Sequence, residues 1–265
     1  MSDNLTTKTT KTTKTAKTFH NILWSKYFLP TLYFIFIAIG IIQIILYSKE
    51  IYSPIHENSA EWNSYWRGWL VLFFSITGSL SAVTGTFFIN RRSKKWIYPQ
   101  MWTMPAMTLA MIFSLLPLQA LQWILTIIPL TILYRTWNKD DPQSFKPKKL
   151  SSSSILISLI VCVLLTFTLG FLVSSINNWI NTDIKYFDAF PYVDSAILVF
   201  SIYAPFLIAK SYWAGNYFYF IANFIAIILF IIIGNYVLVL INLVFLFYCF
   251  VGTFSWIGLY HGINE

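Results

Sequence analysis

The sequence predicts an all-α polytopic membrane protein with eight transmembrane helices. Of its 265 residues, 57% are hydrophobic and only 11% are charged, whereas a soluble domain carries about 25% charged residues. The apolar residues form eight runs close to the roughly 20 residues that cross a bilayer, and most basic residues lie in short segments between these runs. The formal net charge of +8 therefore indicates orientation in the membrane and gives no support for nucleic-acid binding.

The predicted elements follow one another with little chain between them. Residues 1–27 repeat Thr and Lys and are too polar to bury a core, so we expect a disordered basic cytoplasmic tail. Residues 28–47 form an additional N-terminal span. The eight expected spans are Phe28–Tyr47, Trp66–Ile89, Pro99–Leu116, Leu118–Tyr134, Ile155–Ser175, Val193–Ala209, Tyr212–Ile233 and Tyr236–Tyr260.

The basic residues are distributed unequally between the two sides of the membrane. Most of the 18 lysines and arginines fall in the N-terminal tail, in the loops near residues 91–95 and 135–149, or at Lys210. These segments all lie on one side if the spans alternate in direction, and that side is cytoplasmic by the positive-inside rule. Both termini are then cytoplasmic, which requires an even number of spans.

The loop lengths predict a repeated architecture. Two groups of three closely spaced spans, 66–134 and 193–260, flank a single linker helix at 155–175. One intervening helix gives the two groups the same orientation, so the core is a three-plus-one-plus-three parallel repeat. Parallel repeats are a plan used by transporters, which bind substrate between the repeats near the middle of the membrane.

Polar residues inside the second group are candidates for a binding face. Asn216, Tyr219 and Asn223 are spaced three and four apart, which places them on one face of a helix. Such a face can stack an aromatic ring and hydrogen-bond hydroxyl or carboxamide groups, or it can hold neighbouring helices together. Asn242 and Tyr248 in the last span allow the same two interpretations.

The corner before residue 99 supplies further candidates with competing explanations. Gln100 and Trp102 follow Pro99, and Tyr98 precedes it. These side chains could face a ligand, lie in water near the cytoplasmic end, or belong to an interfacial aromatic belt.

Three other features are interpreted as structural. Gly78 and Gly85 lie on a small-residue face that favours close helix packing. Asp194 is expected at the outer mouth and Lys210 at the inner end, both outside the hydrocarbon.

The sequence offers no catalytic constellation. It has no nucleotide-binding loop and no Ser, His and Asp grouping, and its three histidines are scattered without ligand spacing. Cys162 and Cys249 both lie in apolar runs, where neither is typical of a disulfide or a metal site. We therefore expect no enzyme activity, no metal and no cofactor.

Several short motifs resemble the PnuC-type family of nicotinamide riboside and vitamin transporters. The stretch 192–223 resembles the second half of these proteins, and Trp96-Ile97-Tyr98-Pro99 resembles their first corner. The two tryptophans of the family signature are replaced here by Asn216 and Tyr219, and a glycine usual after the first corner is Met101. The other matching positions are Asp194, Ser195, Ser201, Ile202, Ala204, Lys210, Asn223, Gly252 and Trp256.

The resemblance implies a fold and a function. The fold would be SWEET-like and the protein a homotrimer in the cell membrane. It would carry a vitamin-like molecule by facilitated diffusion, with uptake driven by a cytoplasmic kinase that phosphorylates the arriving substrate. Nicotinamide riboside is the leading substrate, and thiamine, riboflavin or a deoxynucleoside are alternatives. A substrate-binding membrane subunit that does not itself transport is a different class of alternative.

The resemblance also suggests roles for the candidate residues. Tyr219 would stack on the ring of the substrate, and Asn223 and Gln100 would hydrogen-bond its ribose or amide groups. The remaining candidates, which would complete the wall of the site, are Asn216, Trp102, Asn242, Tyr98 and Tyr248.

Overall fold

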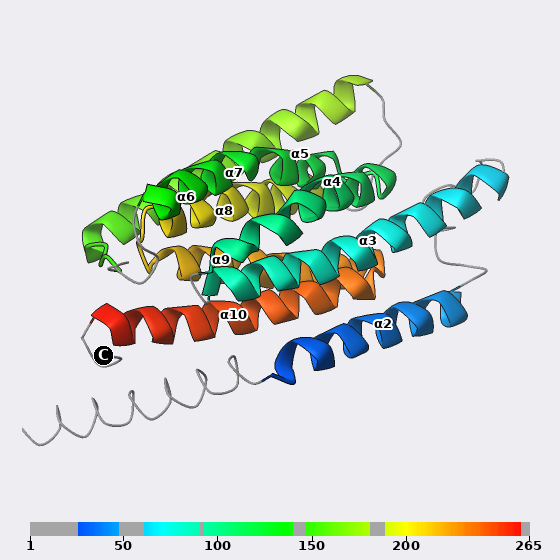
Figure 1. The fold of residues 1–265 in the computed structure, drawn as a ribbon. Coiled ribbons are helices and arrows are strands. Elements are labelled where there is room, and N and C mark those ends of the chain that lie inside the picture. Colours follow the sequence, from blue (N-terminus) through cyan, green and yellow to red (C-terminus); the bar gives the residue numbers. More distant parts are fainter. Residues whose placement is uncertain (1–25, 48–60, 91–92, 140–146, 181–188, 261–265) are drawn as a thin grey trace, which may run out of the picture.

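A computed structural model describes residues 26–47, 61–90, 93–139, 147–180 and 189–260. In these ranges the chain is helical, and its long helices lie side by side as a bundle (Figure 1). The helices are α2 (Phe28–Tyr47), α3 (Glu61–Asn90), α4 (Ile97–Phe113), α5 (Pro117–Leu125), α6 (Ile127–Lys139), α7 (Ser152–Ile180), α8 (Phe190–Ala209), α9 (Gly215–Ile233) and α10 (Tyr236–Tyr260), with a 3₁₀ turn, η2 (Lys94–Trp96), before α4.

Six segments in the described ranges are long and apolar enough to cross a membrane. They are Arg67–Ile89, Pro117–Thr136, Ser152–Ile176, Phe190–Ala209, Gly215–Ile233 and Tyr236–Ile257. Of the two remaining expected spans, α2 has the expected bounds Phe28–Tyr47, and α4 has 17 residues. The protein is therefore a multi-pass membrane protein, and the count of eight spans stays a prediction.

The third and fourth expected spans have different boundaries in the structure. The turn between them lies at residues 114–116, where Leu115 adopts a left-handed backbone (φ 58°), and Pro117 begins α5. The expected single span Leu118–Tyr134 is two helices separated at Thr126. Pro129 explains the break, because it has no N–H to bond to the carbonyl of Leu125.

The corner between α8 and α9 is longer than the sequence suggested. The expected start at Tyr212 is wrong, since α9 begins at Gly215 and Ser211 has a left-handed backbone (φ 71°). The Lys148 N–H donates to the Ser211 carbonyl (2.7 Å), and the Trp213 N–H donates to the Lys148 carbonyl (3.3 Å). The segment before α7 is thus tied to this corner.

The two predicted groups of helices contact each other reciprocally. The first helix of one group, α3, packs on the last helix of the other, α10, while α8 packs on α5 and α6. Outside this core, α2 packs on α3 and α10, and α7 packs on α8, so α2 and α7 lie at opposite edges of the bundle (Figure 1).

The small-residue face of α3 packs against α4, as the sequence indicated. A methyl group added at Gly78 would lie 2.7 Å from the Sδ atom of Met107, and one added at Gly85 would lie 2.7 Å from Nε2 of Gln100. Glycine at these two positions allows α4 to approach closely and places Gln100 inside the bundle.

Candidate functional site

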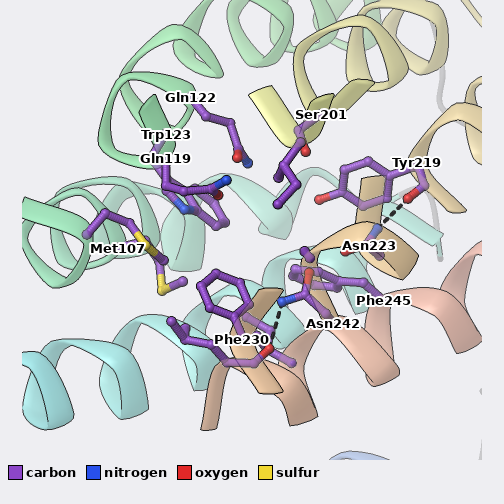
Figure 2. A pocket seen from close by; sticks show the side chains of 15 residues that line it. Met107, Gln119, Gln122, Trp123, Ser201, Tyr219, Asn223, Phe230, Asn242 and Phe245 are labelled. Carbon is purple, nitrogen blue, oxygen red and sulfur yellow. Dashed lines mark hydrogen bonds between the residues drawn. The ribbon is translucent and has the colours of Figure 1, made fainter. Parts of the chain in front are cut away.

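Two adjacent cavities lie between the two groups of helices. The first, which we name the Gln119 cavity, has a volume of about 370 Å³, including the part open to solvent. Side chains from α5, including Gln119 and Gln122, face Ser201 and Tyr219 from α8 and α9 across the same space (Figure 2). Its lining is Met107, Met111, Gln119, Gln122, Trp123, Ile197, Ser201, Tyr219, Asn223, Ala226, Phe230, Leu238, Ile241, Asn242 and Phe245.

The second, which we name the Gln100 cavity, is larger and lies nearer the basic loops. It has a volume of about 820 Å³, including the part open to solvent. Its lining is Ala82, Thr86, Ile89, Gln100, Trp123, Thr126, Pro129, Leu130, Leu133, Pro205, Ile208, Asn216, Tyr219, Phe245, Tyr248, Cys249 and Trp256.

Three aromatic residues line both cavities. They are Trp123 from α5, Tyr219 from α9 and Phe245 from α10. The rings of Tyr219 and Phe245 contact each other with centroids 5.9 Å apart and planes tilted by 44°. We call these residues the aromatic wall, because they separate the two spaces.

Two of the predicted asparagines line the Gln119 cavity, and both also bond to the backbone of their own helix. The amide nitrogen of Asn223 donates to the Tyr219 carbonyl (2.6 Å), and that of Asn242 donates to the Leu238 carbonyl (2.6 Å) (Figure 2). One donor of each amide is thus occupied, so only the rest of its capacity is free for a ligand.

Three other predicted residues line the Gln100 cavity. Gln100 and Asn216 are both buried, and the Asn216 amide nitrogen has no hydrogen-bond partner among the described residues. Tyr248 points its hydroxyl toward the Val83 carbonyl at 3.5 Å. An orphaned buried donor beside a cavity is a group that a ligand acceptor can satisfy.

Tyr98 and Trp102 lie outside both cavities, which corrects their expected place in the wall. They are 73% and 44% exposed. Together with Met101 they are spaced three and four apart on α4, so all three share the face opposite Gln100. Once Gln100 packs on α3, these two aromatic side chains must point outward.

Asp194 lies about one turn after the start of α8, near the expected outer end. Its side chain is only 2% exposed. It accepts a hydrogen bond from Nε2 of Gln119 at 2.8 Å. This bond joins α8 to α5 across the contact between the two groups of helices.

Sequence reasoning missed Gln119, Gln122 and Trp123. The two glutamines are three residues apart within an apolar span. Burying an unpaired amide is costly, and the same argument that identified the asparagines could have identified these glutamines. Trp123 and Phe245 gave no such signal, because an aromatic residue in an apolar helix is equally typical of a packed core.

The chemistry of the lining favours a neutral or positively charged aromatic ligand. Among the described residues, neither lining contains a lysine, arginine, aspartate or glutamate. Aromatic rings and amides can stack on a heterocycle and hydrogen-bond its substituents. In the described ranges no group of three or more His, Cys, Asp and Glu residues could hold a metal ion.

Comparison with known proteins agrees with this arrangement. A solved structure described as the crystal structure of the vitamin B3 transporter PnuC superposes with a TM-score of 0.59 and 16% sequence identity, covering 91% of this chain and 94% of that one. No curated protein sequence matches significantly. The model of the nicotinamide mononucleotide transporter family matches residues 68–258. Because that match spans most of the sequence, the resemblance to PnuC-type proteins is confirmed, and this chain belongs to the nicotinamide mononucleotide transporter family.

Proposed function

We propose that this protein carries nicotinamide riboside, the nucleoside without its phosphate, by facilitated diffusion. The family name refers to a mononucleotide, whose phosphate carries nearly two negative charges at neutral pH. Proteins bind buried phosphate mainly through arginine and lysine, and no basic residue of the described ranges lines either cavity. The lack of described basic residues in both linings is the observation that carries this choice of substrate.

The polar and aromatic lining supports a pyridine nucleoside. Tyr219 and Trp123 offer ring faces for stacking in both cavities. Amides for the ribose hydroxyls and the carboxamide come from Asn216 and Gln100 in the Gln100 cavity and from Asn223 in the Gln119 cavity. The cavities lie between the two groups of helices, where a parallel-repeat transporter binds its substrate.

The transport cycle and assembly follow from the same proposal. The protein would cross the cell membrane eight times, with both termini in the cytoplasm. Its first helix would precede a core of three, one and three helices arranged as a parallel repeat. The reciprocal contacts of α3 with α10 and of α8 with α5 and α6 support this repeat. A cytoplasmic kinase would trap the arriving substrate, and the protein would assemble as a homotrimer.

Binding and flux of the purified protein test the proposal. Thermal-shift and calorimetric titrations would compare nicotinamide riboside with nicotinamide mononucleotide, thiamine, riboflavin and a deoxynucleoside, and liposomes would report flux. We expect nicotinamide riboside to bind at least tenfold more tightly than the mononucleotide and to cross the liposome membrane without an added gradient of another solute. Equal binding of the phosphorylated form would refute the choice of substrate, while binding without flux would favour a non-transporting subunit.

Asn216→Ala provides a sharper test because the amide nitrogen that it removes has no hydrogen-bond partner among the described residues. We expect affinity for nicotinamide riboside to fall about tenfold, as for the loss of one hydrogen bond of about 1.4 kcal/mol, with no drop in melting temperature. Ser75→Ala is the matched control, since the Ser75 hydroxyl is also buried and unpaired among the described residues but lines neither cavity. An equal loss of affinity in both variants would contradict a role for Asn216 in binding.

A further inference from the structure

Asp194 carries a buried carboxyl group, and no described residue neutralises its charge. Its side chain is 2% exposed, and Gln119 is its hydrogen-bonding partner. No ion pair joins it to any lysine or arginine of the described ranges. The negative charge of a carboxylate in such a place is only partly stabilised, because one neutral hydrogen-bond donor does not replace its hydration shell or a counter-charge.

The carboxyl group lies close to the Gln119 cavity. Ile197 and Ser201, which line this cavity, are three and seven residues after Asp194 on α8 and therefore share its face. At about 1.5 Å of rise per residue, Asp194 lies about one helical turn beyond Ile197. Asp194 is not in the described lining, but its partner Gln119 is, so the Gln119 amide connects the carboxylate to the cavity.

Other features of the same cavity add negative potential. The Oε1 atom of Gln122 is buried without a hydrogen-bond partner among the described residues, and Gln122 lines the cavity. The Tyr219 and Trp123 rings offer π-faces that attract cations. No described basic residue lines the cavity, so each of these groups favours a positive charge there.

We propose that Asp194 determines the charge specificity of the carrier by supplying the counter-charge for a cationic aromatic substrate, such as an N-alkylated pyridinium. This inference rests on the proposed function and names the substrate class that the site prefers. Gln119 lines the cavity and holds the carboxylate directly behind the lining, and the substrate brings the positive charge that the described residues lack there. Uncharged heterocycles of the same shape gain no such interaction.

A pair of nearly isosteric ligands isolates the effect of charge. Nicotinamide riboside carries a pyridinium cation, and its 1,4-dihydro form is neutral with almost the same shape. We expect the full-length wild-type protein to bind the cation at least tenfold more tightly in calorimetric titration. In Asp194→Asn, whose side-chain oxygen can still accept from Gln119, we expect affinity for the cation to fall about tenfold and affinity for the neutral form to change less than twofold.

The outcomes separate this inference from the proposed function. Equal binding of both ligands by the wild type, or an unchanged preference in Asp194→Asn, overturns the role of Asp194. Binding of neither ligand overturns the proposed function instead. If Asp194→Asn does not fold, Gln119→Lys places an ammonium group beside the carboxylate and is expected to abolish the preference, and a retained preference in that variant also overturns the inference.

Discussion

At the scale of single residues, the position of Gln100 depends on a residue that touches no ligand. Gly85 leaves room for the Gln100 side chain between α3 and α4, and a methyl group there would lie 2.7 Å from Nε2 and 3.0 Å from Cγ of Gln100. Because the glutamine is flexible at its end, it can move aside, and its amide would then change position in the cavity.

Gly85→Ala is therefore expected to weaken binding without unfolding the protein. Within a helix alanine is intrinsically favoured over glycine by about 1 kcal/mol, and at the buried position 85 this preference offsets part of the cost of displacing the glutamine. We expect affinity for nicotinamide riboside to fall about fivefold and the melting temperature to stay within about 2 °C. In a Gln100→Ala background the same change should have no further effect on affinity, and a full additional loss would contradict this mechanism.

Residue chemistry also sets the limit of prediction from sequence. Asn216, Asn223 and Asn242 could be found because an amide in an apolar helix needs a partner. Tyr98 and Trp102 were misplaced, because their sequence neighbourhood does not say which face of α4 packs on α3. That choice is made by Gly85 and Gly78 on another helix, and so depends on tertiary contact.

At the scale of elements, the corner between α8 and α9 is the most constrained connection. Gly215 starts α9 where a side chain would collide with backbone: an added methyl group would lie 2.8 Å from the Ala204 carbonyl oxygen and 3.0 Å from the Ile208 nitrogen. The corner places Asn216 directly after this glycine, so its geometry also positions a cavity residue.

Gly215→Ala is expected to destabilise the protein because backbone atoms cannot move aside as a side chain can. Overpacking of this kind costs about 1–3 kcal/mol, which corresponds to a melting temperature lower by about 5 °C. Gly234→Asn is the control: Gly234 has φ 78° with nothing near its missing side chain, and asparagine tolerates that backbone. Similar melting temperatures for Gly215→Ala and wild type would show that the corner relaxes.

Element boundaries were predictable where an apolar run ends abruptly. The helix Tyr236–Tyr260 has the expected bounds, since Gly234 and Asn235 interrupt the apolar sequence before it. The break between α5 and α6 was not predicted, because Pro129 lies inside an uninterrupted apolar run. The effect of Pro129 appears one turn earlier, at the Leu125 carbonyl, to which proline cannot donate a hydrogen bond.

At the scale of the whole molecule, the charge asymmetry predicts which ends of the bundle face the cytoplasm. The described basic residues Lys94 and Lys149 are exposed at the predicted cytoplasmic side, and Ala189 is exposed at the other. Both native cysteines, Cys162 and Cys249, are buried, so the parent protein should react little with thiol reagents.

Substituted-cysteine labelling in cells tests this orientation. We expect Ala189→Cys to react with a membrane-impermeant maleimide on intact cells, and Lys94→Cys and Lys149→Cys to react only after lysis. The difference follows from the rule that basic loops stay on the cytoplasmic side. The opposite labelling pattern would reverse the proposed topology, and labelling of all three on intact cells would contradict the predicted span count.

The aromatic wall has a kinetic consequence. Both cavities are lined by the same three residues, Trp123, Tyr219 and Phe245. When one of these rings moves to contact a molecule in one cavity, it can no longer contact a molecule in the other cavity. The two spaces compete for the same three side chains and should hold one occupant between them. Uptake should then saturate as in a single-occupancy carrier, and labelled substrate should exchange against unlabelled substrate on the opposite side faster than it leaves alone.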